Sequence, residues 1–595
     1  MDHYVLTDKP LQETGGTSRP AQPFYFNGLA GYFHPATGRT AVLLVSPWGY
    51  EELCARKSYR ILGEKLAEAG YPCLRFDFPA TGNSSGAAAV LDDDGAWRKA
   101  VRDALSELRR RTGAERVVAI GQGIGATLAA GLAADGEADG LVLLAPVLQG
   151  RAYLRELAAW TAMTRPTFLV NASDGPEGGL MAGGFVLSAA TAGEIKSLNL
   201  LKMTLPQSVR TLLVERLEHP GDLKLADQLT SAGKDVERMT FEGYADYVSD
   251  PTLSVVPEAT LDAVVHWIGR CFSPVPAEAA ASPEDASVLQ AGPGVEEEAV
   301  RFGPDGMFFG VLARPVSGSP KTAVVILNSG YDHSIGWART AVGFARRLAG
   351  EGHAVLRMDL AGMGESRYWP GQARQVLYSD RQVEDVGAAI DFLIARTGLE
   401  KVVLCGRCSG AYLALLAASR ETRVGAAYLI NPRRLVWDPD ENVDLAIREP
   451  IQSLETYGRK VFDRDTLKRV LSGDINVVSA CVKLRRAATR KLDRVLGPVF
   501  GSLSKHQRLF RILRDRLNRL ADRKVAVRLV YSENDRGIPD MENWFGKTRQ
   551  GLAAYPDVTL HFVANADHNL TPEAAREEVQ SDLSEFLAAQ ENEQV

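Results

Sequence analysis

The sequence predicts an α/β fold that occurs twice in one chain, each copy a mostly parallel sheet covered by helices on both faces. Two observations predict it. Short apolar segments typical of buried strands alternate with helical segments, which is the pattern of a parallel sheet with helical crossovers. The same order of signals then occurs on either side of residues 273–296, which indicates an internal repeat with a long period.

Residues 273–296 are rich in Ala, Glu, Pro and Gly and have no apolar periodicity, so we expect a linker there. It divides the 595 residues into a first domain at 1–272 and a second at 297–595. Domains of this length suit an α/β fold. With 45% hydrophobic and 24% charged residues, the composition is that of an ordinary globular protein.

Each copy opens with an apolar strand that leads into a glycine-containing loop, the strands being residues 41–45 and 323–327. A helix and a second strand follow, and the second strand ends in the pattern Asp-x-x-x-x-Gly-x-Ser, beginning at Asp77 and at Asp359. These aspartates look like catalytic acids in isolation. Because the loop occurs in both copies, we expect them to hold it by hydrogen bonds instead.

A nucleophile elbow follows in the second copy. Residues 406–410 read Gly-Arg-Cys-Ser-Gly, directly after an apolar run and directly before a helix-forming segment. Small residues must flank the nucleophile because this strand-to-helix turn is strained and tightly packed. A helix N-terminus stabilises a thiolate, so Cys408 is a candidate for covalent catalysis. Ser409 would replace it only if the frame slipped and the glycine spacing were lost.

The first copy has the same frame, Gly-Gln-Gly-Ile-Gly at residues 121–125, but Gly123 stands in the nucleophile position. The first domain is therefore expected to be catalytically silent.

With these motifs in place, the chain resembles the α/β-hydrolase fold over nearly all its length in two copies. The elbow, the strand–glycine loop and the aspartate loop carry the resemblance. More narrowly, the second half looks like the exosortase A system-associated hydrolases found with bacterial exopolysaccharide genes, of the subtype with cysteine at the elbow. The first half is similar to their companion hydrolase type. The narrower likeness rests on residues 426–432 and 467–473.

In this fold the acid follows a late strand and the histidine follows the last one. The strand at 526–531 is followed by Asp535, and the strand at 558–563 by His568. We expect His568, oriented by Asp535, to take the proton from Cys408.

The first copy serves as a control for this assignment. Ungapped alignment of the same segments places Tyr247 where His568 stands and His219 where Asp535 stands. All three catalytic positions are therefore substituted in the first domain, which fits loss of chemistry with retention of the fold.

Further site residues are expected around the nucleophile. The backbone N–H of Ser409 and one from the loop with Gly330 and Tyr331 would bind the oxyanion. Candidate substrate-binding side chains are Arg407 beside the nucleophile, His333 beyond the loop, and Arg433 and Arg434 just past a strand end.

Cys405 and Cys408 form a Cys-x-x-Cys pair, which admits a redox or metal interpretation. The counterpart of Cys405 is Ile120, so we favour a core role for it. No second ligand pair occurs, and we expect neither a metal nor a cofactor. The scattered cysteines and the absence of a signal peptide or long apolar stretch favour the cytoplasm.

Between nucleophile and acid the second copy is the longer one, so we expect a cap at about residues 433–525. Its part from 483 to 524 is strongly basic, with leucines at helical spacing, which predicts an amphipathic helix. Its arginines either form a solvated face or bind an anionic partner: an acyl carrier protein, coenzyme A, an acidic polysaccharide or a membrane surface. The net charge of −6 gives no bias toward nucleic acid.

The leading functional hypothesis is acyl transfer through a thioester on Cys408, with an acyl thioester or ester as donor. The exopolysaccharide resemblance implies an acyltransferase in polysaccharide or natural-product assembly. The alternatives are an esterase or thioesterase that releases the acyl group to water, and a non-catalytic scaffold or binding protein.

Overall fold

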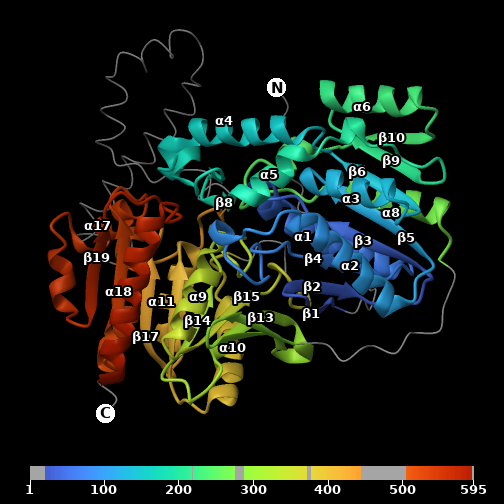
Figure 1. Ribbon diagram of the computed structural model, residues 1–595. Coiled ribbons are helices and arrows are strands. Elements are labelled where there is room, and N and C mark those ends of the chain that lie inside the picture. The colour runs from blue at the N-terminus through green and yellow to red at the C-terminus, as the bar shows by residue number, and fades with distance from the viewer. Residues whose placement is uncertain (1–19, 218, 275–286, 372–376, 444–503, 593–595) are drawn as a thin grey trace, which may run out of the picture. The chain divides into compact units, whose positions relative to one another are not determined.

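The computed structural model describes residues 20–217, 219–274, 287–371, 377–443 and 504–592 (Figure 1). The chain divides into two compact units. One runs to Val376 and includes Thr571–Arg576, and the other comprises Leu377–Leu570 and Glu577–Val595. The first repeat lies in the first unit, whereas the second repeat contributes to both. Most of the expected cap, at 444–503, lies outside the described residues, as does the 467–473 segment.

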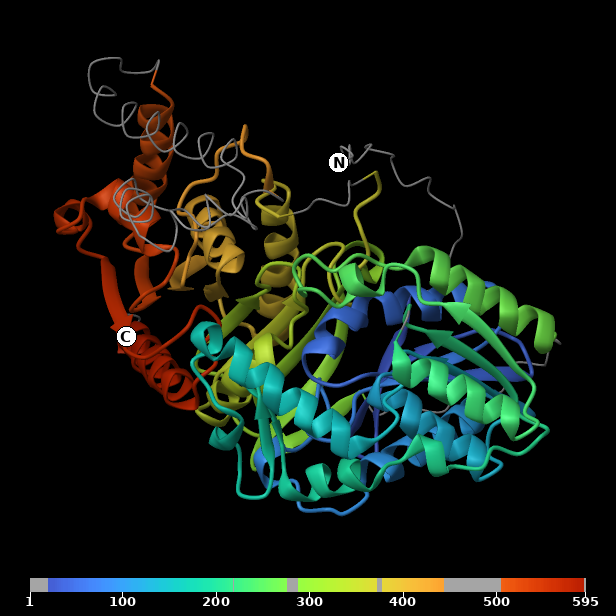
Figure 2. The same ribbon diagram turned by 90° about the horizontal axis from the view of Figure 1, so that it is seen from above.

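The first repeat forms a sheet in the order β1-β2-β4-β3-β5-β6-β9-β10, seen from above with its flanking helices in Figure 2. β2 is antiparallel to β1 and β4, and the remaining pairs are parallel. The strands are β1 (Gln22–Phe26), β2 (Leu29–His34), β3 (Thr40–Val45), β4 (Cys73–Phe76), β5 (Arg116–Gln122), β6 (Gly140–Leu144), β9 (Arg210–Glu215) and β10 (Val236–Thr240). The main helices are α1 (Tyr50–Glu68), α2 (Ala96–Thr112), α3 (Ile124–Ala134), α4 (Gly150–Phe168), α5 (Ala189–Ser197), α6 (Pro220–Ser231) and α8 (Glu258–Cys271).

Helices cover both faces of this sheet, as the sequence predicted. Alternate residues of a strand point to opposite faces, and here they enter two separate cores. Leu43 packs in one core with Trp97 of α2. Its neighbour Leu44 packs in the other with Tyr59 of α1 and Val264 of α8.

The second repeat supplies strands to both units. In the first unit, β11 (Val288–Gly292), β12 (Val295–Phe302), β13 (Phe308–Pro315) and β15 (Ala354–Asp359) pair antiparallel in that order, and β14 (Ala323–Leu327) pairs parallel with β15. Helix α9 (Thr340–Gly350) packs on β15 and β13. β11 lies within the segment expected to be a linker, because Leu289 is buried against Tyr25 and Phe309.

In the second unit, β16 (Val402–Arg407), β17 (Val424–Ile430), β18 (Ala526–Ser532) and β19 (Val558–Val563) run parallel in that order. The helices are α10 (Gln382–Thr397), α11 (Ser409–Arg420), α16 (Lys505–Asp522), α17 (Ile538–Phe545) and, from Glu577 on, α18 (Glu573–Asn592). All four carboxyl ends of these strands therefore lie at one edge of the sheet, where an α/β site is expected.

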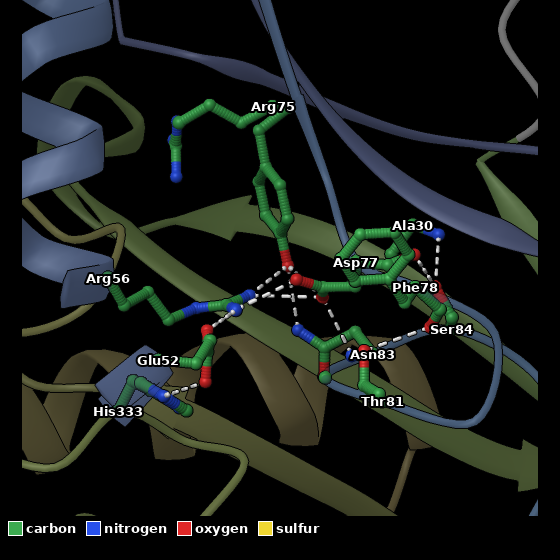
Figure 3. A network of polar contacts seen from close by, with 12 residues as sticks. Ala30, Glu52, Arg56, Arg75, Asp77, Phe78, Thr81, Asn83, Ser84 and His333 are labelled. Atoms are coloured by element: carbon green, nitrogen blue, oxygen red, sulfur yellow. Dashed lines mark hydrogen bonds and ion pairs between the residues drawn. The ribbon is translucent and has the colours of Figure 1, made fainter. Parts of the chain in front are cut away.

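The loops that follow β4 and β15 have the same internal hydrogen bonds. The N–H of Asn83 donates to Asp77 Oδ2, and the N–H of Glu365 donates to Asp359 Oδ2, each at 2.8 Å. In each loop the serine hydroxyl donates to the main-chain oxygen of the same aspartate. Figure 3 shows the first of these loops, where Arg56 also binds Asp77. Both aspartates shape their loops, as expected.

Buried polar contacts join the first repeat to the second within the first unit. Arg75 donates to both carboxylate oxygens of Glu365, at 2.9 and 2.7 Å, and the two side chains are 4% and 2% exposed. Arg357 donates to Asn83 Oδ1 at 2.9 Å. The arginines occupy equivalent positions in the two repeats, and so do Asn83 and Glu365. The contact is therefore reciprocal, like an isologous interface between two copies of one fold.

The same interface buries arginine and tryptophan side chains of the second repeat. The guanidinium of Arg339 donates to main-chain carbonyls of the first repeat, those of Ala80, Gly82, Ser84 and Gly86. Trp337 donates to the carbonyl of Gly183 at 2.9 Å and packs with Phe168. The first repeat thus satisfies the polar groups of Trp337 and Arg339, which directly precede α9.

Candidate active site

Cys408 occupies the sharp turn between β16 and α11, with φ 56° and ψ −116°. This backbone conformation is strained for a residue with a side chain, and such residues gather at functional sites. The turn leaves no room for a side chain before the nucleophile: a Cβ at Gly406 would collide with the carbonyl of Gly410. Packing therefore requires glycine at position 406, as the motif predicted.

The first repeat keeps the same elbow around its glycine. Gly123 has φ 56° and ψ −122°, and its N–H donates to the carbonyl of Leu144. The N–H of Cys408 donates likewise to Ile430. The backbone is therefore conserved between the repeats, and the nucleophile side chain is what differs.

Asp535 and His568 form a hydrogen-bonded pair in the second unit. His568 Nδ1 lies 2.6 Å from Asp535 Oδ2, and Gly537 N–H donates to Asp535 Oδ1 at 2.7 Å. His568 Nε2 is buried and has no nitrogen or oxygen partner among the described residues. The carboxylate therefore orients the ring and leaves its second nitrogen for another group.

The nearby group is the thiol of Cys408, whose charge interacts with that of His568. Burial raises the pKa of Cys408, but His568, Arg433 and Arg407 together lower it to about 7. Burial lowers the pKa of His568, but Asp535 and Cys408 raise it to about 9. The residues expected to act together are thus brought together, and a thiolate–imidazolium pair is favoured near neutral pH.

Cys405 lies within β16 and is 1% exposed. Burial raises the pKa of its thiol to about 12. It therefore stays protonated in the core, and the five cysteines among the described residues are free. His561 lies within β19, and its Nε2 is 3.0 Å from Glu578 Oε1.

The loop that carries His568 is held from three directions. Asn431 donates to the carbonyl of His568 at 3.0 Å, and the Ser532 hydroxyl donates to the carbonyl of Asp567 at 2.8 Å. Arg407, proposed from sequence as a substrate-binding residue, donates to Asn569 Oδ1 at 2.6 Å. Sequence reasoning missed Asn431 and Ser532, although Asn431 directly follows a strand in a left-handed conformation, a position that favours Asn.

The remaining arginines lie at the end of β17. Arg433 interacts electrostatically with Cys408. Arg434 pairs with Glu441 at 3.1 Å. Burial raises the pKa of Asp540, and the charge of Arg434 offsets part of that rise. Arg434 therefore serves the local structure, whereas Arg433 acts on the nucleophile through its charge.

An aromatic group beside the nucleophile was not found from the sequence. Tyr378 stacks on Trp437, with ring centroids 4.3 Å apart, and meets Tyr412 edge to face at 5.0 Å. No motif marks these residues, because they come from three separate segments.

The expected oxyanion donors fall in different units. Ser409 is the first residue of α11 and is buried, so its N–H lies at the helix N-terminus beside Cys408. Gly330, which has φ 58°, and Tyr331 belong to the first unit. His333 also lies there, 5% exposed, with Nε2 3.9 Å from Glu52 of the first repeat (Figure 3).

In the first repeat, the carboxylate of Glu51 occupies the space next to Gly123 that a nucleophile side chain would need. A Cβ added at Gly123 would lie 2.6 Å from Glu51 Oε2. Gln122 donates to the same carboxylate at 2.8 Å, and the Tyr247 hydroxyl donates to Gln122 Oε1 at 3.0 Å. His219, at the position of the acid, caps helix α6. These contacts replace a catalytic group at each position.

Helix α16 is the described part of the basic segment. Leu513, Leu517 and Leu520 are buried, which confirms the amphipathic pattern. Ile512 is 42% exposed, because it lies about 100° around the helix from Leu513. Its exposed arginines are Arg508, Arg511, Arg514 and Arg519. The basic residues at 483–494 lie outside the described residues.

Within the described ranges, no cluster of His, Cys, Asp and Glu could hold a metal ion. A search of the same ranges finds no helix with the length and apolar character needed to span a membrane.

Two families match the chain, one on each repeat. Residues 324–580 match the Alpha/beta hydrolase family, and residues 39–180 match the serine aminopeptidase family S33. No curated protein matches significantly.

Among solved structures, an esterase of Pyrococcus furiosus is 17% identical, covering 49% of this chain and 92% of its own, with a TM-score of 0.30. A membrane phospholipase A described as a bacterial virulence factor is 20% identical, covering 62% and 98%, with a TM-score of 0.29. A dienelactone hydrolase from Anabaena variabilis is 16% identical, covering 50% and 98%, with a TM-score of 0.30.

The family matches follow the two repeats in order, and each repeat has a mostly parallel sheet, flanking helices and an elbow. The chain therefore contains α/β-hydrolase folds in two parts, and the family matches support a hydrolase enzyme.

Proposed function

We propose that the protein is an acyl-transfer enzyme that carries the acyl group as a thioester on Cys408. The observation that supports this most strongly is the cysteine at a strained elbow, coupled to a histidine that is itself bonded to a buried carboxylate. A scaffold or binding protein would have no need of this arrangement. The first repeat, where all three positions are substituted, shows that the fold persists without it.

The mechanism follows from the shared proton. His568 holds the proton of Cys408, and the thiolate attacks the carbonyl carbon of an acyl thioester or ester. A bond forms between Sγ and carbon, and the carbonyl electron pair moves to oxygen. The N–H of Ser409 stabilises that oxygen, which is worth about 3 kcal/mol for one such donor. The intermediate then collapses, and the leaving group takes the proton from His568.

In the second half of the reaction an acceptor takes the acyl group from Cys408 by the same steps in reverse order. His568 removes a proton from the acceptor, which attacks the thioester, and the thiolate of Cys408 leaves. A thioester suits an amine or alcohol acceptor, and the resemblance to hydrolases found with exopolysaccharide genes favours transfer to a glycan. Water is the second candidate, giving an esterase or thioesterase, and the hydrolase family matches favour it.

The exposed arginines of α16 would bind the anionic part of the donor. This helix carries four exposed arginines although the chain as a whole has a net negative charge: Arg508, Arg511, Arg514 and Arg519. An acyl carrier protein or the phosphates of coenzyme A would complement them. An acidic polysaccharide or a membrane surface would bind by the same charge.

The test is acylation by 4-nitrophenyl acetate, followed through release of 4-nitrophenolate. The wild-type protein should give a burst of one equivalent, and Cys405→Ala should give the same burst. Cys408→Ala should give none. A full burst from Cys408→Ala would contradict the assignment. Comparing product formation in water with that in added alcohol or amine would then separate hydrolysis from transfer.

A further inference from the structure

Tyr378 is held in a conformation that bulky residues rarely adopt. Its φ is 61°, and a left-handed backbone is strained for a residue with a large side chain. The side chain is 8% exposed. It stacks on Trp437 with an interplanar angle of 7° and meets Tyr412 edge to face. The ring therefore has one fixed position, maintained at the expense of backbone strain.

This position is beside the elbow. Tyr412 lies in the first turn of α11, where its N–H donates to the carbonyl of Cys408. Packing on Tyr412 therefore brings Tyr378 to the start of the nucleophile helix. Burial raises the pKa of Tyr378 well above its ordinary value, and the charge of Cys408 raises it further. The hydroxyl thus stays protonated within electrostatic range of the nucleophile.

The hydroxyl of Tyr378 makes no hydrogen bond to any residue that the structure describes. The other buried tyrosines of this unit do bond: Tyr428 donates to Asp582 at 2.7 Å, Tyr531 donates to the carbonyl of Pro432 at 3.3 Å, and Arg516 donates to Tyr412 at 3.5 Å. The Tyr378 oxygen is not among the fully buried side-chain atoms that lack a partner, so it is open to the space around it. Near a nucleophile, a hydroxyl placed in this way can donate to a ligand atom.

The silent repeat has no counterpart of this tyrosine. Helices α2 and α10 end in equivalent left-handed glycines, Gly113 and Gly398. Counting back from them, Asp93 occupies the position of Tyr378, and Asp93 is exposed. The fold therefore does not require an aromatic side chain here, and Tyr378 occurs in the repeat that carries Cys408.

We propose that Tyr378 is a catalytic residue whose hydroxyl donates a hydrogen bond to the oxyanion formed when Cys408 attacks an acyl carbonyl. This role rests on the proposed function. As the Sγ–carbon bond forms, the carbonyl electron pair moves to oxygen, and that oxygen accepts from the Tyr378 O–H. The proton stays on Tyr378 throughout. When the intermediate collapses, the leaving group takes its proton from His568.

The test compares two reactions of the same thiol in Tyr378→Phe, which keeps the stacked ring and loses only the hydroxyl. Acylation by 4-nitrophenyl acetate forms an oxyanion, whereas alkylation by iodoacetamide does not. We expect the acylation rate to fall about 100-fold, the usual effect of losing one oxyanion donor, with alkylation unchanged. Tyr412→Phe removes the neighbouring hydroxyl and should leave both rates unchanged.

Three results would count against this role. An acylation rate in Tyr378→Phe equal to that in Tyr412→Phe would remove it. An equal loss of alkylation would show that the hydroxyl acts on the thiolate or the fold instead. If the wild-type protein formed no acyl adduct on Cys408, the proposed function would fail first, and the role of Tyr378 with it.

Discussion

Replacing Glu365 with glutamine should destabilise the first unit substantially. The change keeps the shape of the side chain and leaves the guanidinium of Arg75 buried without its carboxylate. Removing one partner of a buried pair costs about 3–5 kcal/mol. A cooperative unit of about 380 residues has an unfolding entropy of about 0.8 kcal/mol/K. The expected loss in Tm is therefore about 4–6 °C, measured by differential scanning calorimetry.

The matched control is Glu115→Gln, which breaks the exposed ion pair with Arg39, whose two side chains are 50% and 61% exposed. Exposed pairs contribute about 0–1 kcal/mol, so its Tm should change by about 1 °C or less. Equal shifts in Glu365→Gln and Glu115→Gln would refute the argument that the reciprocal contact holds the repeats together.

The Tm difference between wild type and Glu365→Gln should depend on pH in one direction. Burial would raise the pKa of Glu365, but the charges of Arg75, Arg56 and Arg60 lower it well below the usual range. A carboxylate with a depressed folded-state pKa contributes stability above its unfolded pKa of about 4.3 and loses it as pH falls through the folded value. The Tm difference between wild type and Glu365→Gln should therefore be constant at neutral pH and shrink below about pH 4.

Three further outcomes are expected. The rate of Cys408 alkylation by iodoacetamide should rise with pH through a midpoint of about 7. In His568→Ala that midpoint should move upward, because the main cause of the low thiol pKa is gone. An unshifted midpoint would show that His568 does not act on the thiol. Gly123→Ser should lower the Tm and add no second acylation site, because its side chain meets Glu51; a second acylated residue in the mass spectrum would contradict this. The fragment 287–595 should be less soluble or melt lower than the full chain, since it lacks the first-repeat partners of β11 to β15; identical behaviour would remove the structural role of the first repeat.

The candidate catalytic residues could be proposed from the sequence because their constraints are local or repeated. The elbow is marked by glycines that close packing requires, and its spacing places Cys408 without reference to any distant residue. Asp535 and His568 follow strand ends in a fixed chain order. The first repeat, with substitutions at Gly123 and Tyr247, provided a comparison within the same sequence.

Features that depend on distant contacts could not be predicted. The position of the Tyr378 ring depends on stacking against Trp437 and on a strained backbone. Neither feature leaves a pattern in the sequence. The contact between Arg75 and Glu365 joins different positions of the two repeats, and periodicity cannot reveal such a pairing. β11 was missed because a short edge strand beside a polar segment has too few apolar residues to stand out, and Leu289 is the one that enters the core.

The most direct test of a thioester on Cys408 is the intact mass of the protein after incubation with an acyl coenzyme A, followed by peptide mapping. We expect one added acyl group on the peptide that contains Cys408, removable by hydroxylamine as a thioester should be. Cys408→Ala should remain unmodified, while Cys271→Ala, which alters a thiol away from the elbow, should be acylated like the wild type. Acylation that persists in Cys408→Ala, or that maps to another residue in the wild type, would contradict it.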